Sequence, residues 1–159
     1  MIIFRVRQRP SWILCCIALI AWAPVLHAQA SASNTQAQPQ LIMPEDLVKV
    51  LKSAGTKPLI LNIGPWLLFV QAHIPGAEFI GQGSDPQALQ RLRDRVQKLP
   101  HNSYIVLYCG CCPWAHCPNV NPAYAELRRL GFTNVKVLYV ADNLGTDWVY
   151  KGYPAVSGQ

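Results

Sequence analysis

The sequence lacks the residue patterns of several large enzyme classes. Its 159 residues show no Ser-His-Asp arrangement, no phosphate-binding glycine loop and no paired carboxylates suited to acid–base catalysis. No C-x-x-C-H motif is present, so covalently attached c-type haem is not indicated. No internal repeat is visible either. The chemistry of this chain therefore has to come from another residue type.

Acidic residues are also scarce, with 8 Asp and Glu against 14 Lys and Arg and a net charge of +6. Part of the excess lies at the start, where Arg5, Arg7 and Arg9 precede an apolar run over residues 12–26. A small-x-small cleavage pattern, Ala28-Gln29-Ala30, follows. This order of features predicts a signal peptide over residues 1–30 and a periplasmic or secreted protein. The apolar run is short for a membrane span, so we expect no stable membrane insertion after cleavage.

Cleavage would change the charge argument, because the leader holds three arginines and no acidic residue. The net charge falls from +6 to +3, so the basic composition is weak evidence for nucleic acid, which we do not expect as a partner. Basic residues at positions 91–98 are interpreted as the solvated face of a helix. Residues 31–40 are small and polar and predict a flexible linker. Residues 41–156 are then long enough for one domain.

Within that domain, helical and strand-like patterns alternate. Helices are predicted at 43–54, at 85–98 with Asp85 as N-cap, and at 121–131 with Asn121 as N-cap, with a last helical turn at 147–151. Strands are predicted at 58–63, 78–81, 103–108 and 135–140. The apolar run at 64–70 is interpreted as a turn that packs on the core. Apolar strands joined by helices favour an α/β fold whose parallel sheet is covered on both faces.

The most reactive part of the chain is a run of four cysteines within nine residues: Cys109, Cys111, Cys112 and Cys117. We call residues 109–119 the cysteine loop. It follows a predicted strand and precedes a predicted helix, where backbone N–H groups and the helix dipole favour thiolate over thiol. Cys109, at the strand end, is the candidate nucleophile. The two other cysteines of the chain, at positions 15 and 16, would leave with the signal peptide.

Several separated segments resemble the rhodanese-like domain family. They are His73-Ile74-Pro75-Gly76-Ala77, Tyr108-Cys109, the run LRRLGFTNV at 127–135 and the run WVYKGYP at 148–154. The resemblance implies a single domain with a central, mostly parallel sheet and helices on both faces. It also implies a sulfurtransferase of the thiosulfate or sulfane-sulfur type that works through a persulfide on Cys109. The implied partners are a small sulfur donor and a thiol acceptor, including a protein thiol.

The cysteine loop departs from this family. Asn62 and Gly64 stand where the family usually has an aspartate and an arginine, and no arginine lies between Cys109 and Asn121. His116 is the only potential cation in the loop. Together with Trp114 and Gly110 it is a candidate for supporting the reactive sulfur.

The roles of the remaining cysteines stay open. Cys111, Cys112 or Cys117 is a candidate for resolving an intermediate on Cys109 or for forming a disulfide. No cofactor is required for sulfur transfer, but four soft thiolates also suit copper, with Cys109 as the fourth ligand. The close spacing argues against structural zinc. The alternatives to an enzyme are therefore a non-catalytic module that binds copper or a protein partner, and a thiol–disulfide redox protein.

Overall fold

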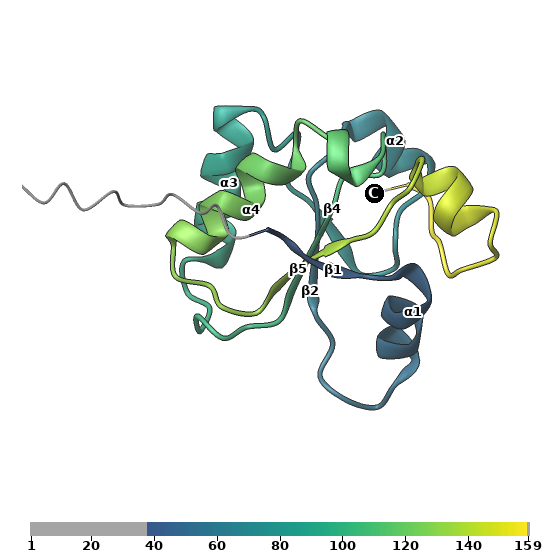
Figure 1. Cartoon of the computed structure of the whole chain (residues 1–159), viewed down its shortest axis with the longest axis horizontal. Helices are drawn as coiled ribbons and strands as arrows, with labels where there is room; N and C mark the ends of the chain where they lie inside the picture. The colour runs from purple at the N-terminus through teal and green to yellow at the C-terminus, as the bar shows by residue number, and fades with distance from the viewer. Residues whose placement is uncertain (1–37, 159) are drawn as a thin grey trace, which may run out of the picture. The chain divides into compact units, whose positions relative to one another are not determined.

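The computed structural model describes residues 38–158, which form a five-stranded sheet with the order β1-β5-β4-β2-β3 (Figure 1). Its strands are β1 (Gln40–Ile42), β2 (Leu59–Asn62), β3 (Ala77–Phe79), β4 (Ile105–Tyr108) and β5 (Val135–Leu138). Every pair of neighbouring strands is parallel. All five strands therefore end at the same edge of the sheet. The predicted α/β fold is confirmed.

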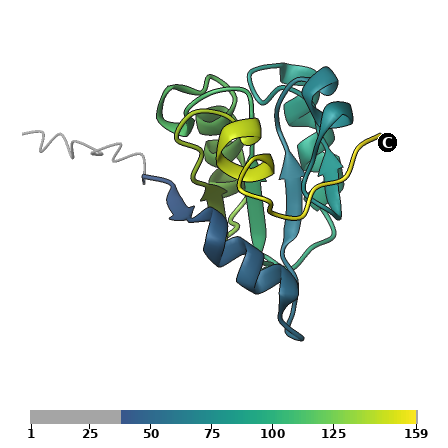
Figure 2. The ribbon, with the colours of Figure 1, turned by 90° about the vertical axis from the view of Figure 1, so that its right-hand side faces the viewer.

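Helices cover both faces of the sheet, because successive strand residues point to opposite sides. Ile105 and Leu107 of β4 pack in one apolar cluster with α3 (Pro86–Val96) and α4 (Val120–Arg129). Val106 and Tyr108 pack in the other cluster with α1 (Pro44–Lys52) and Trp148. Trp148 belongs to a π-helical turn, η2 (Gly145–Val149). Figure 1 shows α3 and α4 on one side of the sheet, and Figure 2 shows α1 and η2 on the other.

Two of the three predicted helix starts at a proline, those of α1 and α3, are confirmed. The Asp85 side chain accepts a hydrogen bond of 2.9 Å from the backbone N–H of Gln87, and Pro86 occupies the first helical position of α3. Pro44 likewise begins α1, after Met43. Proline fits there because its missing N–H would have no partner in the first turn.

Three local expectations differ from the structure. The apolar run after Gly64-Pro65 forms a short helix, α2 (Trp66–Gln71), rather than a turn. Packing of its Phe69 on the core provides the tertiary contact that a short helix needs. Gln40, the last residue of the predicted flexible linker, begins the strand β1, although the sequence shows no alternating pattern there. Helix α4 begins at Val120, so Asn119 rather than Asn121 occupies the N-cap position.

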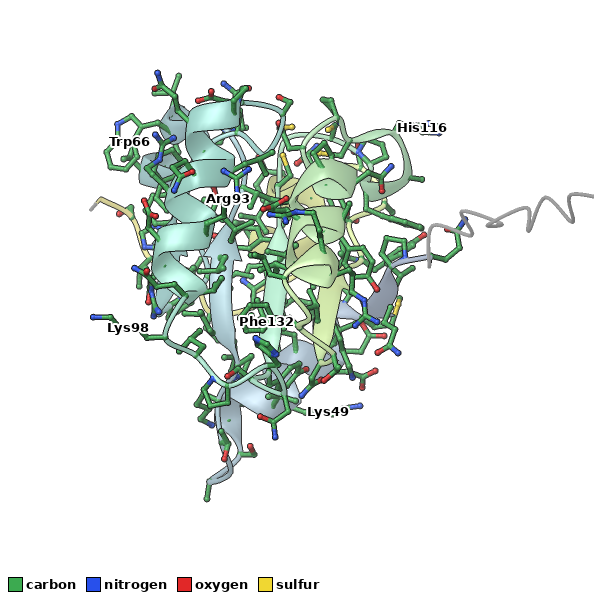
Figure 3. All side chains as sticks on the ribbon, turned by 90° about the vertical axis from the view of Figure 1, so that its left-hand side faces the viewer. Lys49, Trp66, Arg93, Lys98, His116 and Phe132 are labelled. Carbon is green, nitrogen blue, oxygen red and sulfur yellow. The ribbon has the colours of Figure 1, made fainter. Side chains whose placement is uncertain are left out.

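The basic residues of α3 are used within the fold. Arg93 contacts Glu126 of α4 at 2.6 Å, and Arg95 contacts Glu78 at 2.5 Å. Glu126 also accepts a bond of 2.6 Å from Arg129. Figure 3 shows Arg93 between the two helices. These ion pairs join α3 to α4 and to the β3 edge.

Across residues 38–158, no helix combines the length and apolar character that crossing a membrane requires. The predicted signal peptide, and all of the predicted linker before residue 38, lie outside the described residues.

Candidate active site

The cysteine loop leaves the carboxyl end of β4, the central region of the sheet, and leads into α4. Ligand sites of parallel sheets lie at this edge. The four cysteine sulfurs all lie within 4.8 Å of one another. Cys109 and Cys117 are buried, whereas Cys111 and Cys112 are half-buried. The fold thus gathers all four predicted site cysteines into one cluster.

None of the four cysteines forms a disulfide in this structure. The Sγ atoms of Cys109 and Cys111 are 3.1 Å apart, and those of Cys111 and Cys112 are also 3.1 Å apart. A disulfide requires a bond of about 2.05 Å. These sulfurs are therefore in contact without being bonded, and Cys111 is the direct neighbour of Cys109.

Asn119 is a site residue that the sequence did not reveal. Its side-chain oxygen accepts hydrogen bonds from the backbone N–H of Ser84 at 3.1 Å and from the Ser84 hydroxyl at 2.8 Å. A backbone N–H can only donate, so the amide oxygen of Asn119 must face Ser84. The amide nitrogen then faces Cys109, with Nδ2 at 3.3 Å from Sγ. Asn119 is only 2% exposed, so this donor is held in place.

Asn62 and Gly64 support the Cys109 backbone from β2. The Asn62 oxygen accepts the Gly64 N–H at 3.1 Å, and its nitrogen donates to the Cys109 carbonyl at 3.4 Å. A β-carbon on Gly64 would overlap that carbonyl and lie 3.2 Å from the Cys109 sulfur. Glycine at this position is what allows the cysteine loop to approach β2. A long cationic side chain does not fit there.

The two buried cysteines have pKa values shifted in opposite directions. The pKa of Cys117 is lowered to about 5, because the Cys109 thiol and the backbone N–H groups of Asn119 and Val120 donate hydrogen bonds to its sulfur. The pKa of Cys109 is raised, first by the hydrogen bond in which its proton is held by Cys117 and then by burial. Burial also raises the pKa of Cys112 to about 12. The resting pair is therefore a Cys109 thiol beside a Cys117 thiolate at the start of α4.

A cavity of about 320 Å³ opens beside Cys109, Gly110 and Cys111. Its other walls come from the end of β2, from α2 and from η2 with the two residues before it. Gly110 adopts a φ of 81°, and its carbonyl accepts the Leu144 N–H at 2.9 Å, which holds the loop against that segment. Among the described residues, Cys109 and Cys111 line this cavity and Cys117 does not. Cys109 is thus the buried sulfur that a small molecule can reach.

The other predicted support residues lie farther from the sulfur. His116 is exposed in the 3₁₀ turn η1 (Trp114–His116), and Figure 3 shows it at the outer side of the loop. Trp114 is half-buried, and its backbone N–H bonds the Val140 carbonyl at 2.9 Å. Within residues 38–158, neither side chain lines the cavity. Both residues therefore shape the cysteine loop rather than contact the space beside Cys109.

His73, from the H-I-P-G-A segment, packs against the end of α2. Its ring stacks on Phe69 with centroids 4.0 Å apart, and its Nδ1 donates to the Phe69 carbonyl at 2.9 Å. It is 6% exposed and fixes the end of α2. This histidine helps to place one wall of the cavity.

The donor set of the cluster fits a soft metal ion. The group of four consists of sulfur alone, and soft thiolates suit Cu(I) and Zn²⁺ rather than Mg²⁺ or Ca²⁺. The contacts of 3.1 Å are shorter than the edges of about 3.8 Å that follow from Zn–S bonds of about 2.3 Å in a tetrahedron. The sulfurs would have to spread to enclose one tetrahedral ion. Low-coordinate copper would need only two or three of the four sulfurs.

The chain matches the family model described as "Rhodanese-like domain" over residues 43–139. This range includes every strand except β1, together with Cys109, Cys117 and Asn119. No match was found among the curated proteins.

Solved structures share the fold at low sequence identity. The rhodanese-like domain of an Anabaena protein is 22% identical, with a TM-score of 0.53, over 76% of this chain and 80% of that one. The BH2092 protein of Bacillus halodurans is 21% identical, with a TM-score of 0.57, over 74% and 77%. A single-domain sulfurtransferase of Saccharomyces cerevisiae is 19% identical, with a TM-score of 0.53, over 73% and 96%. At these identities the likeness supports the fold.

Proposed function

Because the chain belongs to the rhodanese-like domain family, we propose that it transfers sulfane sulfur through a persulfide on Cys109. One observation carries the proposal. Cys109 lies at the carboxyl end of β4, its sulfur receives the Asn119 amide N–H at 3.3 Å, and it lines a cavity of about 320 Å³. The Cys109 sulfur therefore combines a nucleophilic atom, a hydrogen-bond donor beside it and adjoining space for a substrate.

In the first half-reaction, the Cys109 sulfur attacks the outer sulfur of a sulfane donor. The bond between the two donor sulfurs breaks, and its electron pair leaves with the donor. The Cys109 proton moves to the Cys117 thiolate, whose sulfur lies within 4.8 Å of the Cys109 sulfur. The Asn119 N–H stabilises negative charge that develops on the Cys109 sulfur. The Asn119 amide thus takes the stabilising role that a cation of the loop has in the family.

In the second half-reaction, an acceptor thiolate attacks the outer sulfur of the persulfide. Cys109 leaves as a thiolate and regains the proton from Cys117. A competing route is open to Cys111, whose sulfur is 3.1 Å away. Its thiolate can attack the inner persulfide sulfur, which forms a Cys109–Cys111 disulfide and releases hydrosulfide. An external dithiol reductant would then return the pair to thiols.

Intact-mass measurement of the reduced protein after sulfane treatment tests the proposal. We expect an increase by one sulfur atom that cyanide or excess thiol removes. Cys109→Ala should abolish it. The matched variant Cys112→Ala removes a thiol of the same loop outside the cavity lining and should retain the adduct. If Cys109→Ala gains sulfur as readily as the wild type, the assignment of the nucleophile is wrong.

We further propose that the protein is exported. Three arginines, an apolar run and an Ala-Gln-Ala pattern within residues 1–30 support a cleaved signal peptide. In the oxidising periplasm or outside the cell, the disulfide route would compete strongly with transfer. Mass determination of the mature protein from the cell envelope tests the proposal, with cleavage expected after Ala30. An intact N-terminus would argue for an uncleaved anchor.

A second candidate function is binding of Cu(I), favoured by four sulfurs within 4.8 Å of one another. Titration of the reduced protein with Cu(I) against a competing chelator tests it. Stoichiometric binding that blocks sulfur loading of Cys109 would support a copper module. Absence of binding at chelator-limited copper concentrations would exclude it.

A further inference from the structure

The cavity beside Cys109 has an uncharged lining. Among residues 38–158, its walls include no Asp, Glu, Lys, Arg or His. Besides the thiols of Cys109 and Cys111, the polar side chains are the amides of Asn62, Gln71 and Asn143, and the rest of the surface is apolar or backbone. A substrate in this space meets dipoles and apolar side chains, and no counter-ion.

The basic residues of α3 bind other groups of the fold. Arg93 and Arg95 form ion pairs with Glu126 and Glu78, and Arg91 donates to the Ile80 carbonyl at 2.7 Å. Gly64, which the sequence aligns with a family arginine, has no room for a side chain next to Cys109. The lack of a cation at this site is therefore part of the packing of the domain.

This setting discriminates between two kinds of sulfur donor. Thiosulfate is a dianion, and its transfer leaves sulfite, a second dianion, beside Cys109. Removing such ions from water without a counter-charge is costly, and amide dipoles offset only part of that cost. An organic persulfide instead releases its carrier as a thiolate with a single charge, which then takes up a proton. Its carbon chain can contact apolar walls such as Leu68, Leu144 and Val149.

We propose that this cavity takes sulfur from an organic persulfide whose carrier bears no carboxylate, sulfonate or phosphate, rather than from an oxyanion donor. The proposal rests on the proposed persulfide function of Cys109 and names its donor class. In the transfer, Cys109 passes its proton to the Cys117 thiolate, its sulfur attacks the outer sulfur of R–S–SH, and the S–S bond breaks. Cys109 becomes Cys–S–SH, and the electron pair leaves on R–S⁻, which is then protonated. No net oxidation or reduction accompanies the exchange.

Two neighbouring leucines of α2 provide a matched test. Leu68 lines the cavity and is 38% exposed, whereas Leu67 is 65% exposed and lies outside the lining. Leu68→Arg and Leu67→Arg therefore add the same charge to the same helix, but only one adds it to the cavity. Gln71→Arg, also at the lining and exposed, is a second variant should Leu68→Arg unfold the domain.

The rates of Cys109 loading from benzyl persulfide and from thiosulfate would be followed by intact mass, and folding by circular dichroism. We expect wild type to load from benzyl persulfide and only slowly from thiosulfate. Leu68→Arg or Gln71→Arg should raise thiosulfate loading about tenfold, as one added charge pair near a protein surface can do, whereas Leu67→Arg should not.

Two outcomes overturn the inference. One is wild-type loading from thiosulfate at least as fast as from benzyl persulfide; the other is an equal gain for Leu67→Arg and Leu68→Arg. Loading from neither donor is a separate result, because it removes the proposed persulfide function and the donor preference with it.

Discussion

The Asn119 amide offers a direct test of how Cys109 is stabilised, through the substitution Asn119→Asp. Aspartate has the same shape and keeps an oxygen for the two Ser84 donors at 3.1 Å and 2.8 Å. It replaces the N–H that faces the Cys109 sulfur at 3.3 Å by a carboxylate oxygen. The variant thus removes one hydrogen bond and brings a like charge to the attacking sulfur.

The expected size follows from the geometry. A hydrogen bond to a charged group contributes about 1.5–3 kcal/mol. Each 1.36 kcal/mol or so in the barrier changes the rate about tenfold. Since the group is 2% exposed, solvent cannot replace the lost donor. We therefore expect Asn119→Asp to slow persulfide formation on Cys109 by about 10- to 100-fold.

The assay follows the rate of adduct formation by intact mass, with the sulfur donor in large excess so that the kinetics are pseudo-first-order. Thermal unfolding is measured in parallel. Asn121→Asp is the matched control, because it makes the same exchange two residues away at an exposed position of α4. It should load at the wild-type rate. Wild-type loading by folded Asn119→Asp, or an equal slowing in Asn121→Asp, would refute a role for the amide.

Other predictions concern the thiolate, the β2 contact and the α3–α4 ion pairs. In the reduced protein, one thiolate absorbance band should titrate near pH 5, being present above and lost below, and Cys117→Ser should remove that transition. Gly64→Ala should lower the free energy of unfolding by about 1–3 kcal/mol in urea melts, because its β-carbon overlaps the Cys109 carbonyl; unchanged stability would contradict the contact. Hydrogen bonds from Arg129 and Arg93 lower the pKa of Glu126 to about 2 from 4.5. The ionised form therefore stabilises the fold above pH 4.5, and this contribution is lost as the pH falls towards 2. In urea melts, Glu126→Gln should lower the free energy of unfolding by about 2 kcal/mol at pH 7 and by little at pH 2. The exposed control Glu45→Gln should change it little at either pH.

The sequence was sufficient for those parts of the fold whose signals are local. Asp85-Pro86 marks the start of α3, and the apolar run before Cys109 marks β4, because capping and burial on both faces leave clear patterns. The helix α2 was missed, since a six-residue helix depends on the packing of Phe69 rather than on its own sequence. The edge strand β1 was missed because its three residues carry no periodicity.

The candidate site was predictable only in part for the same reason. Cysteine spacing indicated the cluster and its strand-end member Cys109. The donor Asn119 depends on Ser84, which is 35 residues away along the chain and is brought close by the fold. The sequence also offers a stronger N-cap signal at Asn121, because Pro122 follows it. The predicted helix start therefore lies two residues after the buried asparagine. Contacts of this kind have no signature in the local sequence.

The cysteine loop is fixed at its two ends and less tightly held in its middle, so its parts differ in how well they should tolerate substitution. Its first residue, Cys109, continues β4, and its last, Asn119, is joined to Ser84 and to α4. Between them, residues 113–116 are half-buried or exposed, and the hydrogen bond from the Trp114 N–H to the Val140 carbonyl links them to the segment after β5. This middle segment is therefore a site where residues could be exchanged or grafted to recruit a different partner, while the sulfur and its amide donor stay where the sheet and helix hold them.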